Sequence, residues 1–150
     1  MEINQLDQNC SEKIERFIVK VDDEFIPPLS SKVSIPQWSK KLNALAVNIA
    51  KVNFNGDLDA LISFYPNKDK ESYISFIAVG KSQRGKKLAG TLLDRCIKIC
   101  TDMRSTSIKV HTWLSNDKIS NIYHSRGFVD IEIINDRGSD KTLILEKKLC

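Results

Sequence analysis

The segment 73–93, YISFIAVGKSQRGKKLAGTLL, limits the choice of fold more than any other part of the chain. Its first part is rich in aromatic and β-branched residues and predicts a strand that ends at Val79. Its last part repeats leucine at helical spacing, and a basic turn joins the two. A turn from a strand into a helix presents unpaired backbone N–H groups and the positive end of the helix dipole. We therefore expect an anion to bind at this turn, from Arg84 onward.

Hydrophobic spacing and turn residues predict the remaining elements. Strands are expected at 1–6, 44–53, 58–65, 73–79, 107–113, 128–134 and 142–149, and helices at 11–21, from Pro36 through Leu42, at 86–104 and at 117–126. Three consecutive strands are joined by short turns, and other strands are separated by single helices. This order predicts one α/β (α+β) domain over residues 1–150, with a mixed, mostly antiparallel sheet and helices on both faces.

The composition is typical of a soluble globular protein. Hydrophobic residues make up 41% of the chain and charged residues 28%, and no apolar run approaches the ~20 residues that a membrane helix needs. The first residues, MEINQLDQNCSEK, contain neither a basic leader nor an apolar stretch. We expect a cytoplasmic protein with no membrane partner.

The distribution of charge and the cysteine content limit which classes of ligand we expect the chain to bind. Residues 1–33 carry seven acids and four bases, whereas residues 81–126 carry ten bases and three acids. These bases are spread over a loop and two predicted helices with few aromatic residues between them, so we expect no nucleic acid partner. The four cysteines form no C-x-x-C pair and the chain has two histidines, so we expect no metal site. Cys96 and Cys100 are expected to be core residues of one helix.

The basic turn also matches a family motif. The sequence RGKKLA, residues 84–89, resembles the pattern Q/R-x-x-G-x-G/A of the GNAT superfamily of N-acetyltransferases, whose backbone amides bind the pyrophosphate of coenzyme A. Lys87 stands where the family usually has glycine. Because a residue that enters a helix needs no positive φ, we expect this replacement to leave the pyrophosphate site intact.

A second motif lies downstream. Asn116, Ile119, Tyr123, Gly127 and Phe128 keep every spacing of the GNAT signature N-x-x-A-x-x-x-Y-x-x-x-G-F, with Ile119 in place of the alanine. In the family the asparagine helps to hold the cofactor, the tyrosine approaches the thioester sulfur, and the Gly-Phe pair turns the helix into the next strand. The alternative for Tyr123 is a core tyrosine whose hydroxyl reaches the surface.

The resemblance covers nearly the whole chain and implies an enzyme that transfers an acetyl group from acetyl-CoA to a primary amine, by direct attack in a ternary complex. Tyr123 is the expected acid that protonates the departing thiolate. The expected base is Glu71 or His111; either could instead be an ordinary surface residue, with water in its place. The resemblance also implies which residues bind acetyl-CoA. They are Ile77, Val79, Arg84, Gly85, Lys86, Lys87, Leu88, Ala89, Gly90, Asn116 and Tyr123.

The acceptor is less well defined than the donor. The stretch FIPPLS, residues 25–30, followed by a helix and then YISFIAV, resembles a bacterial GNAT subset associated with sugar or cell-surface modification, which favours an amino sugar among small-molecule amines. The acidic cluster at residues 22–24 could attract a cationic amine or simply be solvated. The alternative function is a non-catalytic acyl-CoA-binding sensor or interaction module on the same fold. The sequence leaves a homodimer open.

Overall fold

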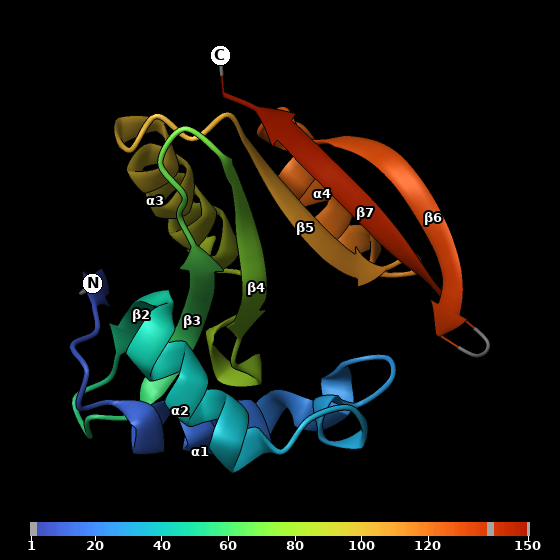
Figure 1. Ribbon diagram of the computed structural model, residues 1–150. Helices are drawn as coiled ribbons and strands as arrows, with labels where there is room; N and C mark the ends of the chain where they lie inside the picture. Colours follow the sequence, from blue (N-terminus) through green and yellow to red (C-terminus); the bar gives the residue numbers. More distant parts are fainter. Residues whose placement is uncertain (1–2, 138–139, 150) are drawn as a thin grey trace.

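A computed structural model of the protein describes residues 3–137 and 140–149. Seven strands form one sheet in the order β1-β2-β3-β4-β5-β7-β6 (Figure 1). Neighbouring strands are antiparallel except β4 and β5, which run parallel. The strands are β1 (Ile3–Gln5), β2 (Val47–Val52), β3 (Leu58–Tyr65), β4 (Glu71–Val79), β5 (Ser107–Trp113), β6 (Val129–Arg137) and β7 (Asp140–Lys148). The helices are α1 (Ser11–Val21), α2 (Ile35–Leu45), α3 (Leu88–Asp102) and α4 (Asp117–Ser125), with 3-10 turns η1 (Asp22–Glu24), η2 (Leu29–Ser31) and η3 (Lys81–Gln83). The predicted mixed, mostly antiparallel sheet is confirmed.

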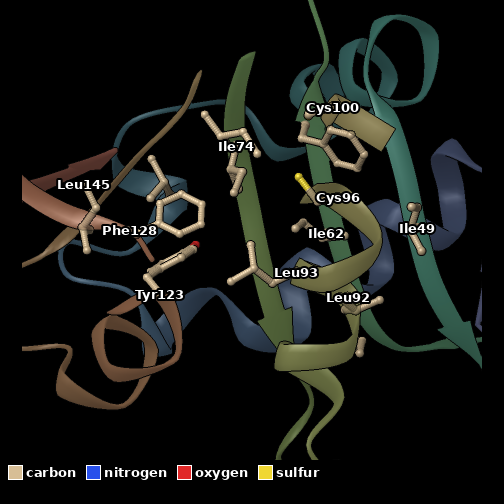
Figure 2. Packing of buried hydrophobic residues seen from close by; sticks show 14 of the residues in the cluster. Ile49, Ile62, Ile74, Leu92, Leu93, Cys96, Cys100, Tyr123, Phe128 and Leu145 are labelled. Carbon is tan, nitrogen blue, oxygen red and sulfur yellow. The ribbon is translucent and has the colours of Figure 1, made fainter. Parts of the chain in front are cut away.

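The helices cover both faces of the sheet, as predicted. The buried residues of α1 recur at helical spacing and form one cluster with α2 and with Leu61 and Phe76 of the sheet. On the other face α3 and α4 pack through a second cluster that includes Leu92, Cys96 and Tyr123 (Figure 2). Cys96 and Cys100 are both fully buried, which confirms their prediction as core residues.

The sheet splits between its two parallel strands. β4 and β5 pair only from Glu71 with Ser107 to Ile74 with Val110, and beyond this point they diverge (Figure 1). The second half of β4 therefore pairs with β3 on one side and with no described strand on the other. Its backbone N–H and C=O groups on the open side are available to a ligand.

A β-bulge in β4 lies at the same place. The register with β3 shifts so that Ser63 pairs with Phe76 while Phe64 pairs with Ile74. Ile74 consequently belongs to the cluster under α3, whereas Phe76 belongs to the cluster under α1 and α2. Strict alternation would place both side chains on one face, so the bulge re-aims the rest of the strand where the sheet splits.

Several predicted boundaries are wrong by a few residues. The second helix extends to Leu45, so the strand expected from residue 44 begins at Val47. The helix expected at 86–104 begins at Leu88 and ends at Asp102. Both ends are set by residues in the left-handed region, Lys87 at φ 60° and Arg104 at φ 61°. Helical spacing alone does not reveal such residues.

Candidate functional site

The end of the loop between β4 and α3, together with the first turn of α3, leaves its backbone donors free. Within the described residues, none of the consecutive N–H groups from Gly85 to Gly90 donates a hydrogen bond, whereas the N–H of Thr91 donates to the Lys87 carbonyl at 3.2 Å. Gly85 has φ 82° and no other atom within 4 Å of the position that a Cβ would take. Since these donors lie at the N-terminus of a helix of 15 residues, the dipole adds to their attraction for an anion. The loop therefore has the donors that the predicted pyrophosphate site requires.

Lys87 contradicts the expectation that its position needs no positive φ. It is the residue before α3 and has φ 60° and ψ 24°. A side chain in this left-handed conformation costs roughly 1–2 kcal/mol, which glycine avoids. A helix that began at Lys86, as the sequence predicts, would include Lys87, but α3 begins two residues later, at Leu88. The backbone of this chain thus keeps a conformation suited to glycine in spite of the lysine.

The loop cations have different partners. Arg84 Nη2 donates to Glu24 Oε1, which joins the loop to the 3-10 turn after α1. Lys86 Nζ donates to Gln83 Oε1 at 3.2 Å, within the loop itself. Arg84 is consequently the loop cation that an acidic side chain already holds.

The remaining predicted cofactor residues lie around the split. Ile77 and Val79 are half-buried on the open half of β4, and pack against the cluster under α3. Asn116 precedes α4, and its Nδ2 donates to Thr112 Oγ1 of β5 at 3.4 Å. Gly90 lies in the first turn of α3, where a Cβ would collide with the Arg126 guanidinium. A side chain at this position would therefore displace the end of the Arg126 side chain.

Tyr123 is fully buried, which excludes the alternative of a hydroxyl at the surface. Its ring lies 5.1 Å from that of Phe128, and its hydroxyl points toward β4 (Figure 2). The hydroxyl has no hydrogen-bond partner among the described residues. An unpartnered buried hydroxyl costs about 1–3 kcal/mol. The hydroxyls of Ser39 and Ser120 are also buried without a partner among the described residues, so the place of Tyr123 beside the split, and not the missing partner alone, makes it a candidate to meet a ligand group. Burial, with further contributions from Cys96 and Tyr73, raises the pKa of Tyr123 above its ordinary value.

Glu71 and His111 lie on the face of the sheet opposite α3 and α4, because their strand neighbours are buried against those helices. Glu71 Oε2 is 3.2 Å from Lys109 Nζ, at the closed end of the split. His111 follows the last residue of β5 that pairs with β4. Its ring meets that of Tyr73 edge-on, with centroids 5.5 Å apart. The structure therefore places His111, rather than Glu71, where the split opens.

The chain from residue 12 to residue 128 matches the model of the acetyltransferase (GNAT) family. This range includes the free amides, the split strands and Tyr123. The chain belongs to the GNAT family. A curated GNAT relative, the chloroplastic GCN5-related N-acetyltransferase 10 of Arabidopsis thaliana, is 29% identical over 73 residues. The alignment covers 49% of this chain and 28% of that protein, so the chain spans less than a third of the relative.

Solved GNAT structures share the fold across nearly all of the chain. An aminoglycoside 6'-acetyltransferase type Ii superposes with a TM-score of 0.79 at 14% identity, covering 100% of this chain and 98% of that one. An aminoglycoside 6'-N-acetyltransferase complexed with coenzyme A gives 0.77 at 12% identity, with the same coverage. A ribosomal-protein-alanine N-acetyltransferase from Brucella melitensis gives 0.75 at 16% identity, covering 99% and 100%. The predicted family and fold are confirmed.

Family membership also bears on the donor. GNAT acetyltransferases use acetyl-CoA, so the predicted donor and reaction class are confirmed at the level of the family. In the ranges that the structure describes, no group of three or more His, Cys, Asp or Glu side chains could hold a metal ion. No helix in these ranges is long and apolar enough to cross a membrane.

An aromatic cluster completes the site on the face opposite α3, and sequence reasoning missed it. Phe25, which follows η1, stacks on Phe76 of β4 with centroids 5.5 Å apart and meets Trp113 of β5 at 5.2 Å. Trp38 of α2 meets Phe76 edge-on at 5.7 Å. The cluster of Phe25, Trp38, Phe76 and Trp113 thus joins the segment between α1 and α2 to both diverging strands. No local spacing predicts it, because the bulge decides the face of Phe76.

Proposed function

We propose that this GNAT protein transfers the acetyl group of acetyl-CoA to a primary amine of a small molecule, by direct attack in a ternary complex. One observation carries the proposal: the free amides of residues 85–90, the open edge of β4 and the buried hydroxyl of Tyr123 all border one split in the sheet. In the reaction the amine nitrogen bonds to the acetyl carbon and the carbon–sulfur bond breaks. The amine loses a proton and the thiolate gains one, so the site needs a base and an acid.

The cofactor's two ends have matching groups in the site. The amides from Gly85 to Gly90 suit the pyrophosphate, with Arg84 and Lys86 beside them. The open backbone edge at Ile77 and Val79 suits the amide groups of the pantetheine arm, which would pair with it as a further strand does. Because Tyr123 is fully enclosed, the side chains around its hydroxyl must shift when the arm enters.

Tyr123 is the proposed acid. The phenol is protonated at neutral pH even at its ordinary pKa of about 10, and its hydroxyl has no competing acceptor among the described residues. A donor that is buried and already oriented toward β4 loses little on meeting the thiolate (Figure 2). Asn116, held to β5 by Thr112, is the proposed second polar contact to the cofactor.

His111 is the proposed base, and Glu71 is the weaker candidate. His111 lies on the opposite side of the sheet from Tyr123, so a base and an acid would act on the two faces of the split. Imidazole is well suited to take a proton near neutral pH. Glu71 is held by Lys109 at the closed end, which keeps its carboxylate from the split.

The proposed acceptor is an amino sugar. In the aromatic cluster Phe76 is buried, whereas Phe25, Trp38 and Trp113 are half-buried and leave part of their flat rings to stack on a sugar. Asp23 of η1 adds an exposed carboxylate nearby. Two of the similar structures are named as aminoglycoside acetyltransferases, which supports this choice. Another is named for the alanine of a ribosomal protein, so a peptide amine is the outcome that would replace it.

The test is thermal denaturation with acetyl-CoA, followed by measurement of thiol release with a panel of amino sugars, polyamines and peptides with free N-termini. A ligand that prefers the native state raises the melting temperature. We expect acetyl-CoA to raise it and at least one amino sugar to support thiol release. A shift by acetyl-CoA without thiol release for any amine would instead establish the non-catalytic sensor. No shift would refute cofactor binding.

The two base candidates are separated by pH profiles of kcat/KM with that amine. His111→Gln should lower kcat/KM and remove the limb of the profile that reports the base. Glu71→Gln serves as the matched comparison and should leave this limb in place. The reverse result would make Glu71 the base.

A further inference from the structure

An ion pair connects the cofactor loop to the segment that borders the acceptor side. Arg84 lies at the start of the phosphate-binding loop, and its guanidinium donates to Glu24, which is 60 positions away in the sequence. The Arg84 side chain is 49% exposed and that of Glu24 is 20% exposed. The pair is therefore reachable by an incoming anion from the side of Arg84.

Glu24 is held in place on the acceptor side. It ends the 3-10 turn η1, which directly follows α1. The next residue, Phe25, is packed between Phe76 and Trp113 on the two diverging strands. The Glu24 backbone is thus anchored on both sides, and this carboxylate cannot easily travel with Arg84 toward a ligand.

A phosphate group would be a stronger partner for Arg84 than the Glu24 carboxylate is. A guanidinium binds a phosphate through two parallel N–H donors, which makes the pair stronger than a single contact with a carboxylate. The Glu24 carboxylate, in contrast, would repel a pyrophosphate that entered the loop. Lys86 and Lys87 make no ion pair within the described residues, so Arg84 is the loop cation at which such an exchange must occur.

We propose that Glu24 competes with the cofactor's pyrophosphate for Arg84, so that cofactor binding releases the Glu24 carboxylate to the acceptor side. This inference rests on the proposed function. When Arg84 turns to the pyrophosphate, Glu24 keeps its place beside the aromatic cluster and gains a free negative charge there. A cationic amine then binds more tightly once acetyl-CoA is present, because the two ligands act on one ion pair.

The test is a double-mutant cycle measured by calorimetric titration with acetyl-CoA. Glu24→Gln removes the competing charge while keeping the size of the side chain. Because an exposed ion pair contributes little, we expect acetyl-CoA to bind about two- to fivefold more tightly to this variant. Arg84→Ala should weaken binding, and adding Glu24→Gln to it should then give a smaller gain than Glu24→Gln alone, because only the direct repulsion of the pyrophosphate is left to remove. Glu12→Gln, which makes the same charge change at an exposed position of α1 outside the site, is the control and should leave the affinity unchanged.

The outcomes separate this inference from the proposed function. If the wild-type protein does not bind acetyl-CoA, the proposed function fails and the inference fails with it. If the wild-type protein binds but Glu24→Gln binds equally or more weakly, the inference is overturned while the proposed function stands. An equal gain in Glu12→Gln would also overturn it, since the effect would then be one of general charge and not of exchange at Arg84.

Discussion

Replacing Tyr123 with Phe should make the protein more stable and nearly inactive. The change removes one hydroxyl and keeps the ring, which packs against Phe128 at 5.1 Å. The hydroxyl is fully buried and has no partner among the described residues. The native protein therefore bears the cost of an unsatisfied polar group, and the variant does not.

The size of both effects follows from this geometry. An unsatisfied buried hydroxyl costs about 1–3 kcal/mol. Removing it leaves a small void that offsets part of this gain, so we expect the free energy of unfolding to rise by about 1 kcal/mol. For a domain of this length such a gain raises the melting temperature by about 2–4 °C. Loss of a general acid lowers turnover by about 10²- to 10⁴-fold.

The assay combines denaturant unfolding without ligand and steady-state turnover with an amine identified as above. Tyr65→Phe is the matched control, because Tyr65 is a partly buried tyrosine that packs in the cluster under α1 and α2. We expect it to leave turnover unchanged. Calorimetry should show nearly equal affinity of wild type and Tyr123→Phe for acetyl-CoA, because a thioester sulfur is a weak acceptor and the hydroxyl gains a strong partner only as the thiolate forms.

Two results would refute this reasoning. A variant less stable than the wild type by more than about 1 kcal/mol would mean that the hydroxyl is hydrogen-bonded in solution. Equal turnover, measured where the chemical step limits the rate, would remove Tyr123 from the mechanism and leave water to protonate the thiolate.

Three further predictions concern the loop and the fold. The double charge reversal of Arg84 and Lys86 to Glu should weaken acetyl-CoA binding by about tenfold or more, since two charge-assisted contacts are replaced by repulsion; unchanged calorimetric affinity in the folded variant would exclude the site. Lys87→Gly should equal or exceed the wild type in unfolding free energy by up to about 1 kcal/mol, whereas Lys87→Val should lose stability, because the position has a positive φ; a stable valine variant would contradict that conformation. Asp59 accepts hydrogen bonds from Lys51 at 2.7 Å and from Asn53 at 3.1 Å. Burial acts to raise its pKa, but these bonds outweigh it and hold the pKa below the ordinary 3.8. Its stabilisation is therefore present above that pH and is lost as pH falls through the lowered pKa. Asp59→Asn should cost about 1.5–3 kcal/mol at pH 7, and denaturation at several pH values should show this difference shrinking below about pH 4.

Much of the fold follows from local patterns in the sequence. The helix α1 is predicted to the residue, because its apolar side chains recur every three or four positions. Strands β3 and β5 are likewise predicted with their observed bounds. The two GNAT motifs locate the loop at Arg84 and the tyrosine at position 123, and their spacing within the chain is enough to indicate both family and donor.

The geometry of the site depends on contacts between distant parts of the chain. The strand ladder that ends at Ile74 and Val110, and the bulge that turns Phe76 to the other face, come from pairing between strands and leave no periodic mark. The same holds for the ion pair of Glu24 with Arg84. Local spacing determines which face of an element is apolar, because helix and strand geometry repeat over a few residues. Which residues meet across the split is decided only when the whole sheet forms, because packing between strands determines their register. The left-handed conformation of Lys87 is likewise absent from the local pattern.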